Sequence, residues 1–192
     1  DPTREGYTFT GWNIDLPATM PATPVNRVAQ WQINTYNAVF YAEATDTDAF
    51  ETVPVVFEEA ITAPEDKPAK TGYVFEGWST DGENVIDDLG YIGAEDVVFY
   101  AVWSEATDTA YTVEHYYMGT DMAYPDDATR TDSFTAATNA TVTATPDADA
   151  NFTVDNAMSV LEGTVAADGS LVLKVYYERE INTLKVEIDG VI

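Results

Sequence analysis

Cysteine is absent from this chain of 192 residues, and its absence excludes three kinds of chemistry. The chain has no means of forming a disulfide, a thiol nucleophile or a zinc–thiolate site. Small exported domains often depend on disulfides. If this chain is exported, it must therefore be stable without them, because it has no cysteine. There is also a single histidine, His115, which excludes a metal site built from several histidines.

Basic residues are scarce: 8 lysines and arginines stand against 34 aspartates and glutamates, for a formal net charge of −26. Binding to nucleic acid requires cationic side chains that neutralise phosphate, so this partner is not expected. Docking on an anionic membrane is not expected for the same reason. No apolar run is long enough to insert into a membrane, and no signal peptide is recognisable. A surface this acidic repels itself and favours an extended arrangement.

Sequence motifs of catalysis are also missing. There is no glycine-rich phosphate loop, nucleophile elbow or metal-ligand spacing. His115 follows Glu114 on an expected strand, and nothing in the spacing supplies a nucleophile for it to activate. We therefore expect a half-exposed strand residue there, and we predict that the protein is not an enzyme and has no catalytic residues.

The stretch Asp147–Asn151 begins like a calcium-binding loop. The pattern then fails, because Phe152 stands where such a loop needs glycine and Met158 where it needs a bidentate glutamate. We interpret the stretch as an acidic turn. No cofactor is expected, apart from calcium bound loosely by acidic turns.

An internal repeat dominates what is present. The heptapeptide Gly-Tyr-Val-Phe-Glu-Gly-Trp at 72–78 matches Gly-Tyr-Thr-Phe-Thr-Gly-Trp at 6–12, an offset of 66 residues (72 minus 6). Both copies follow Pro-x-(Lys/Arg)-x. A repeat of this period indicates an array of small modules in which each unit contacts its neighbours.

Each heptapeptide is expected to form a short strand. Tyr73 and Phe75 are two residues apart, so both point to one face of a pleated strand. Gly77 predicts a bulge that turns Trp78 away from simple alternation. The three aromatic side chains then form a small core, and the alternative is an aromatic platform for a ligand.

The repeat resembles a known family. The heptapeptide after Pro-x-(Lys/Arg)-x, followed by Phe-Tyr-Ala-Val-Trp at 99–103, resembles the Listeria–Bacteroides repeat, also called the internalin B-repeat. The resemblance covers residues 33–103 well and 1–31 partly. The first copy ends in Val-Ala-Gln-Trp at 28–31, without the Phe-Tyr pair, so the pairing of its last strand stays open.

A second type of module follows a polar linker at 104–109. Its end strands are expected at Tyr-Thr-Val-Glu-His-Tyr-Tyr, 111–117, and Leu-Val-Leu-Lys-Val-Tyr-Tyr, 171–177. They resemble the mucin-binding-protein repeats found in surface proteins of Gram-positive bacteria. That resemblance implies a β-grasp-like fold.

The expected fold class is β-rich (mostly β to α+β), with small β-grasp-like modules in an elongated tandem array. Further strands are expected at 7–12, 27–33, 36–43, 52–57, 73–78, 96–103, 131–137, 140–144, 151–154 and 159–162. Pro54 indicates an edge strand, and Asp81-Gly82 a tight hairpin. The expected domains are a partial internalin-B-type repeat at 1–32, a complete one at 33–104, a mucin-binding-protein-like module at 110–179, and the first strand of a following module at 180–192.

The chain reads as a fragment of something longer. Ile-Asn-Thr-Leu at 181–184 mirrors Ile-Asn-Thr-Tyr at 33–36, which marks the start of a module. One hypothesis is that this tail adds a strand to an incomplete module, within the chain or in a neighbouring molecule. The alternative is a frayed end.

Two functions are consistent with these features. The first is an extended acidic stalk or spacer in a secreted protein of the bacterial cell wall, contacting neighbouring modules of the same protein. The second is an adhesive module that recognises host glycans, mucin or matrix proteins, as the resemblance of residues 110–178 implies. Its candidate ligand-binding residues are Tyr116, Tyr117 and Tyr124, and the alternative is that these tyrosines pack on their own sheet.

Overall fold

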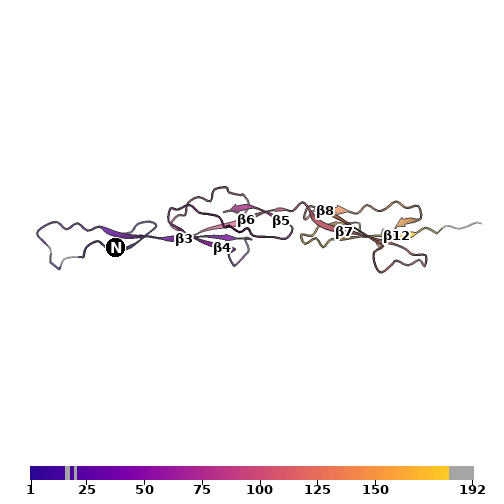
Figure 1. Ribbon diagram of the computed structural model, residues 1–192, viewed down its shortest axis with the longest axis horizontal. Coiled ribbons are helices and arrows are strands. Elements are labelled where there is room, and N and C mark those ends of the chain that lie inside the picture. The colour runs from indigo at the N-terminus through magenta and orange to yellow at the C-terminus, as the bar shows by residue number, and fades with distance from the viewer. Residues whose placement is uncertain (16–17, 20, 182–192) are drawn as a thin grey trace, which may run out of the picture. The chain divides into compact units, whose positions relative to one another are not determined.

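The computed structural model describes residues 1–15, 18–19 and 21–181, and the chain divides into two compact units. Unit 1 comprises residues 1–70 and 75–104, and unit 2 comprises residues 71–74 together with those from 105 onward. The described residues form β-strands joined by turns and loops, with no helix among them (Figure 1). The predicted β-rich fold is therefore confirmed. Of the predicted range from mostly β to α+β, the structure is all-β in the residues described.

The strands fall close to their predicted positions, with one shift near the end of the chain. The first six are β1 (Tyr7–Trp12), β2 (Ala29–Ile33), β3 (Thr35–Tyr41), β4 (Glu51–Val56), β5 (Tyr73–Ser79) and β6 (Val97–Glu105). The last six are β7 (Thr109–Tyr117), β8 (Arg130–Ala136), β9 (Thr141–Thr143), β10 (Phe152–Val154), β11 (Glu162–Thr164) and β12 (Val172–Arg179). The strand expected at 159–162 is the one that shifts, because Val160 makes only an isolated bridge with Lys174.

Two four-stranded sheets share one topology. The order β4-β3-β6-β5 places the first strand, β3, beside the last, β6, and the two run parallel. The order β10-β12-β7-β8 repeats this arrangement, with β7 and β12 parallel at the centre. In each sheet the second strand pairs antiparallel with the first at an edge. The edge position that Pro54 indicated for β4 is confirmed.

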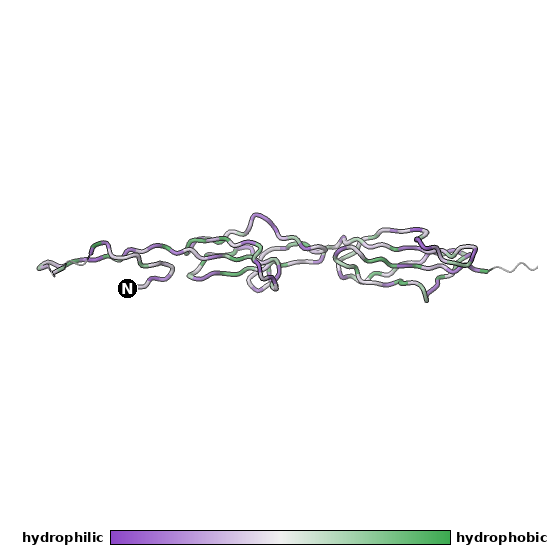
Figure 2. The backbone as a smooth tube through the Cα atoms, turned by 90° about the horizontal axis from the view of Figure 1, so that it is seen from below, coloured by the Kyte–Doolittle hydropathy of each residue, from purple (hydrophilic) through white to green (hydrophobic). Residues whose placement is uncertain are grey.

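The core of the first sheet is aromatic. Phe40 stacks on Phe99 across the parallel pair, with ring centroids 5.0 Å apart, and Trp78 meets Phe40 edge-on at 4.9 Å. Successive residues along a strand face opposite sides of the sheet, so hydrophobic and hydrophilic positions interleave along the backbone (Figure 2). The buried set is Ala38, Phe40, Val55, Trp78, Ile92, Phe99 and Ala101.

The bulge predicted from the glycine before tryptophan is present in the first copy of the motif. The pairing of β1 with β2 shifts register between Phe9 and Gly11. As a result Trp12 returns to the side of Phe9, and their rings meet edge-on at 5.4 Å. In the second copy Phe75 and Trp78 meet in the same way at 5.2 Å.

The first glycine of the motif has a left-handed backbone conformation and a crowded surrounding. Gly6 has φ of 72°, and its carbonyl oxygen accepts a hydrogen bond from the backbone N–H of Asn34 at 2.9 Å. The carbonyl of Asn34 in turn accepts from Phe57 N–H at 3.0 Å. A Cβ at position 6 would lie 2.2 Å from the Phe57 ring, so only glycine fits.

The second copy repeats this pattern among residues of unit 2. Gly72 has φ of 76° and accepts from Ala106 N–H at 2.9 Å, while the Ala106 carbonyl accepts from Thr138 N–H at 2.9 Å. A Cβ at position 72 would lie 2.6 Å from Ala167. Two copies of the motif thus make the same backbone contacts with the segment that follows each of them. We call this contact pattern the glycine junction.

The prediction of a tight hairpin at Asp81-Gly82 is wrong: a turn forms there, but no strand follows it directly. The carboxylate of Asp81 accepts hydrogen bonds from the backbone N–H groups of Glu83 and Asn84 at 2.8 and 2.9 Å. The next strand, however, begins only at Val97, because Ile92 and its neighbours first fold back to cover the core. The tail at 182–192, on which the strand-donation hypothesis rests, lies outside the described residues.

Candidate functional site

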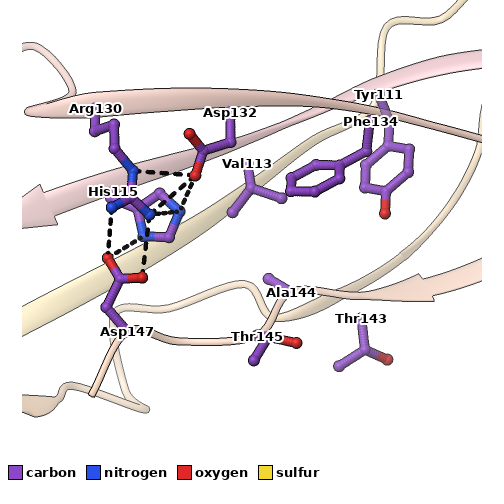
Figure 3. A pocket seen from close by; sticks show the side chains of 10 residues that line it. All are labelled: Tyr111, Val113, His115, Arg130, Asp132, Phe134, Thr143, Ala144, Thr145 and Asp147. Atoms are coloured by element: carbon purple, nitrogen blue, oxygen red, sulfur yellow. Dashed lines mark hydrogen bonds and ion pairs between the residues drawn. The ribbon is translucent and has the colours of Figure 1, made fainter.

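The candidate site is a cavity of about 320 Å³ in unit 2 (Figure 3). Three segments form it: two neighbouring strands, β7 and β8, and the stretch 143–147 that faces them. The residues that line it are Tyr111, Val113, His115, Arg130, Asp132, Phe134, Thr143, Ala144, Thr145 and Asp147.

Strand pairing sets the order of the side chains along the cavity. Alternate residues of β7 face one side of the sheet, and the antiparallel register places a residue of β8 directly opposite each one. Tyr111 pairs with Phe134, and His115 pairs with Arg130 at the other end. The cavity therefore has an aromatic end and a charged end, as Figure 3 shows.

His115 lies at the charged end and is only 2% exposed, so the expectation of a half-exposed strand residue is wrong. Its Nδ1 lies 2.7 Å from the hydroxyl of Tyr177, and its Nε2 lies 3.1 Å from Nη2 of Arg130. A guanidinium group only donates hydrogen bonds, so Nε2 accepts from Arg130 and Nδ1–H donates to Tyr177. Burial, and then the nearby positive charge of Arg130, lower the pKa of His115 and keep the ring neutral.

Arg130 joins two carboxylates in front of the histidine. Its Nη1 lies 2.8 Å from Oδ2 of Asp147, and its Nη2 lies 3.2 Å from the other oxygen of the same carboxylate. Nη2 also lies 2.9 Å from Oδ2 of Asp132. Hydrogen bonds from Arg130 and then from Tyr117 lower the pKa of Asp147, so this carboxylate stays ionised at neutral pH.

The aromatic end is formed by Tyr111 and Phe134. Their rings stack with centroids 5.5 Å apart and planes 25° apart. Phe134 is 45% exposed, which is high for a phenylalanine on a strand. An aromatic face thus stays open to the cavity instead of being covered by the protein.

The tyrosine predicted to be a ligand contact at 116 lies on the opposite face of the sheet. Tyr116 is 6% exposed and stacks on Tyr176 with centroids 4.6 Å apart. Its hydroxyl donates to Glu114 at 2.7 Å, and that bond is the first cause of its raised pKa. The structure therefore places Tyr116 in the packing of its own sheet, the alternative that the sequence left open.

Tyr117 and Tyr124, the other two predicted contacts, come together at a second hollow. It measures about 180 Å³, and its remaining lining residues are Gly119, Asp121, Ala123 and Pro125. The hydroxyl of Tyr124 donates to Asp155 at 3.0 Å, and burial followed by that bond raises the pKa of Tyr124 to about 12. Tyr117 donates to Asp147 and so also supports the charged end of the larger cavity.

The sequence interpretation missed Arg130, Asp132 and Phe134. These residues alternate along β8, so they share one face of the strand. That alternation is visible in the sequence. What it does not reveal is the register that places the three residues opposite His115, Val113 and Tyr111.

The acidic turn at 147–151 is not arranged as a cation loop in this structure. Asp147 turns toward Arg130, and Asp149 accepts from the backbone N–H of Asn151 at 2.8 Å. Within residues 1–15, 18–19 and 21–181, no three histidine, cysteine or acidic side chains are grouped to hold a metal ion. Loose binding of calcium stays a prediction. The described part of the chain also contains no helix long and apolar enough to cross a membrane.

The arrangement suits binding more than proton transfer. Both ring nitrogens of His115 are already engaged, so the imidazole is not free to act as a general base. The carboxylates of Asp132 and Asp147 are partly open, with side chains 37% and 33% exposed. The cavity thus presents fixed donors and acceptors beside an aromatic surface, which is typical of small-molecule sites.

Comparison with known proteins gives a family match and several relatives. The sequence model of the Listeria–Bacteroides repeat domain matches residues 1–43 and 36–102. Internalin H of Listeria monocytogenes is 33% identical over 116 residues, which are 54% of this chain and 20% of that protein. A Gly-rich protein of Evansella cellulosilytica, named as a membrane protein, is 30% identical over 124 residues, 52% of this chain and 14% of that protein. The matches thus span a fifth or less of these relatives.

A solved structure, the crystal structure of Mub-RV, aligns with 78% of this chain and 100% of its own length. The identity is 14% and the TM-score is 0.22.

Proposed function

Because the chain belongs to the Listeria–Bacteroides repeat family through residues 1–43 and 36–102, we propose that it is a non-enzymatic repeat region of a bacterial cell-surface protein. In this proposal its role is that of an extended acidic spacer. The parent protein is secreted by a Gram-positive cell and held at the cell wall, where the spacer separates functional domains from the surface.

The glycine junction is the observation that carries this proposal. In unit 1 the carbonyl of Gly6 is held by Asn34, whose own carbonyl is held by Phe57 in the following repeat. Within unit 1 the first motif therefore bonds to the repeat that comes next in the chain. Contacts limited to neighbours are the basis of quasi-one-dimensional repeat proteins.

Charge supports the same role. A net charge of −26 is spread over a chain with only 8 basic residues, so acidic modules repel one another wherever they approach. Repulsion of this kind opposes collapse of one module onto another. It also falls with added salt, because exposed charges are screened over about 10 Å at 0.1 M.

Small-angle X-ray scattering of the full chain tests the spacer. A compact globule of 192 residues has a radius of gyration of about 16 Å. The proposal expects a clearly larger radius, which decreases only slightly between low and high salt because the modules themselves stay folded. A radius near that of a compact globule at every salt concentration would count decisively against a spacer.

A second candidate function is adhesion, and the cavity of unit 2 is the observation that favours it. A spacer alone has no need for an open aromatic side chain beside a fixed charged cluster. Residues 110–179 also resemble mucin-binding-protein repeats, which implies host glycans, mucin or matrix proteins as partners. Binding of a multivalent form of the chain to arrays of glycans and matrix proteins tests this role, because multivalency reveals weak single sites.

A further inference from the structure

The aromatic end of the cavity provides a flat apolar surface that the protein does not cover. Phe134 is 45% exposed, while Tyr111 behind it holds the ring in place by stacking at 5.5 Å. A ring held by a neighbour loses little conformational freedom when a ligand packs on it, so its contacts contribute more to binding. The ligand that fits this end has an apolar face.

The charged end provides hydrogen-bonding groups whose positions are fixed before a ligand arrives. Arg130 holds the carboxylates of Asp132 and Asp147 at 2.9 and 2.8 Å, and His115 lies behind the guanidinium at 3.1 Å. Both carboxylates remain partly exposed and have lone pairs to spare. The ligand that fits this end donates several hydrogen bonds.

Net charge decides between classes of ligand. Two aspartates, one arginine and one histidine give the cluster a formal charge of −1 with the histidine counted as neutral, and the arginine is already paired with both carboxylates. The whole chain adds a net charge of −26 of the same sign. An anionic ligand would therefore be repelled and would find no free cation at this site.

We infer that the cavity formed by Tyr111, Phe134, Asp132, Arg130 and Asp147 is a binding site for a neutral saccharide. One face of its pyranose ring packs on Phe134, and its hydroxyls donate to the two aspartates. A volume of about 320 Å³ is at the lower end of ligand sites and suits one or two sugar rings. This inference rests on the adhesive function proposed above and is independent of the spacer role.

The test uses the full chain against polymer-linked neutral pyranosides, polymer-linked sialic acid and sulfated sugars, and a panel of matrix proteins. Saturable binding to one or more neutral pyranosides is expected, with no binding to the anionic sugars. F134A and D132N should each weaken that binding by about tenfold or more. The matched controls are Y91A, at an aromatic side chain 73% exposed in unit 1, and D126N in an exposed loop of unit 2; both should bind like the unchanged chain.

Each other result has a defined meaning. Equal or tighter binding to anionic sugars, or neutral binding that survives F134A and D132N with thermal unfolding unchanged, overturns the saccharide site. Binding to matrix proteins alone also overturns it, while leaving the adhesive function standing. If the chain binds none of the probes, both the saccharide site and the adhesive function are refuted. Because Phe134 and Asp132 are partly exposed, both variants should fold. If F134A nevertheless fails to fold, binding measured with D132N alone decides the test.

Discussion

The two four-stranded sheets share a strand order but not a core. The core of the sheet β4-β3-β6-β5 is built from aromatic rings, with Trp78 in edge-on contact with both Phe40 and Phe75. The sheet β10-β12-β7-β8 has a smaller apolar core and buries polar groups, His115 among them, beside an open cavity. The same strand order therefore accommodates two different interiors, one filled with aromatic side chains and one with an open cavity beside it.

Replacing Trp78 with alanine should give the largest effect. The side chain is 6% exposed and contacts Phe40 and Phe75, so its removal should lower the free energy of unfolding of unit 1 by about 3–5 kcal/mol. Hydrogen exchange measured by mass spectrometry reports the two units separately, and unit 2 should keep its protection. W12A, at the same motif position but 40% exposed, is the matched control and should cost much less. Equal losses in the two variants would show that burial of Trp78 adds nothing to its contribution to stability.

Replacing Gly72 with alanine should give the next largest effect. Its φ of 76° costs a side-chain-bearing residue about 1–2 kcal/mol, and the new Cβ would also lie 2.6 Å from the backbone of Ala167. Gly82 has a similar φ of 79° but open space around it, so G82A should show the backbone cost alone. Urea denaturation of the two variants checks the difference. If they lose the same stability, the contact with Ala167 has no energetic role.

The Tyr177 hydroxyl should matter less, and only in unit 2. It accepts from Nδ1–H of His115 at 2.7 Å and from the backbone N–H of Asp147 at 2.9 Å. Y177F leaves both donors unsatisfied in a buried place and should lower the free energy of unfolding by about 1–3 kcal/mol. Y100F, at a half-buried tyrosine stacked on Tyr41 in unit 1, is the control and should change stability by less than about 0.5 kcal/mol. A loss in Y177F no larger than in Y100F would contradict the hydrogen-bond network.

Acid should produce the smallest difference between the units. The pKa of His115 is lowered in the folded chain by burial and by Arg130, so the unfolded chain takes up a proton first, near its ordinary pKa of about 6.5. The contribution of neutral His115 to the free energy of unfolding is therefore fully present above a pH of about 6.5. It is lost as the pH falls toward the pKa of His115 in the folded chain, by at most about 1.4 kcal/mol per pH unit. Hydrogen exchange should show this loss in unit 2, with H115Q as the variant that lacks it. A loss confined to unit 1, which has no histidine, would refute the assignment.

The lowered pKa of Asp147 acts in a separate, more acidic range. Its stabilising contribution is present above the ordinary aspartate pKa of about 3.9 and is lost as pH falls toward the folded value. The groups that face it are Arg130, His115 and Tyr117. The pKa of Asp168 in unit 2 is lowered as well, by hydrogen bonds from Ser170. D147N should therefore reduce the loss of stability in the acidic range without abolishing it, and the loss that begins near a pH of about 6.5 should remain.

Local features of this fold were predictable from the sequence, because they depend on residues near one another. Alternation along the chain gave the strands, and the glycine before Trp12 gave the bulge. The cavity depends on contacts between distant segments: His115 meets Tyr177 across 62 residues, and Arg130 meets Asp147 across 17. A lone polar residue on a strand gave no sign that such partners would bury it, so the site was missed while the strands that carry it were found.

The parallel pairing of first and last strands has a mechanical consequence. If the ends of a module are pulled apart, tension enters at the start of β7 and leaves at the end of β12, at opposite ends of two neighbouring strands. The pairs from Thr112–Val172 to Tyr117–Tyr177 then carry the load together, in shear, instead of opening one after another. The pair β3–β6 is loaded in the same way. Parallel pairing of the first and last strands therefore resists unfolding by tension along the chain, which is the load that the proposed spacer would carry.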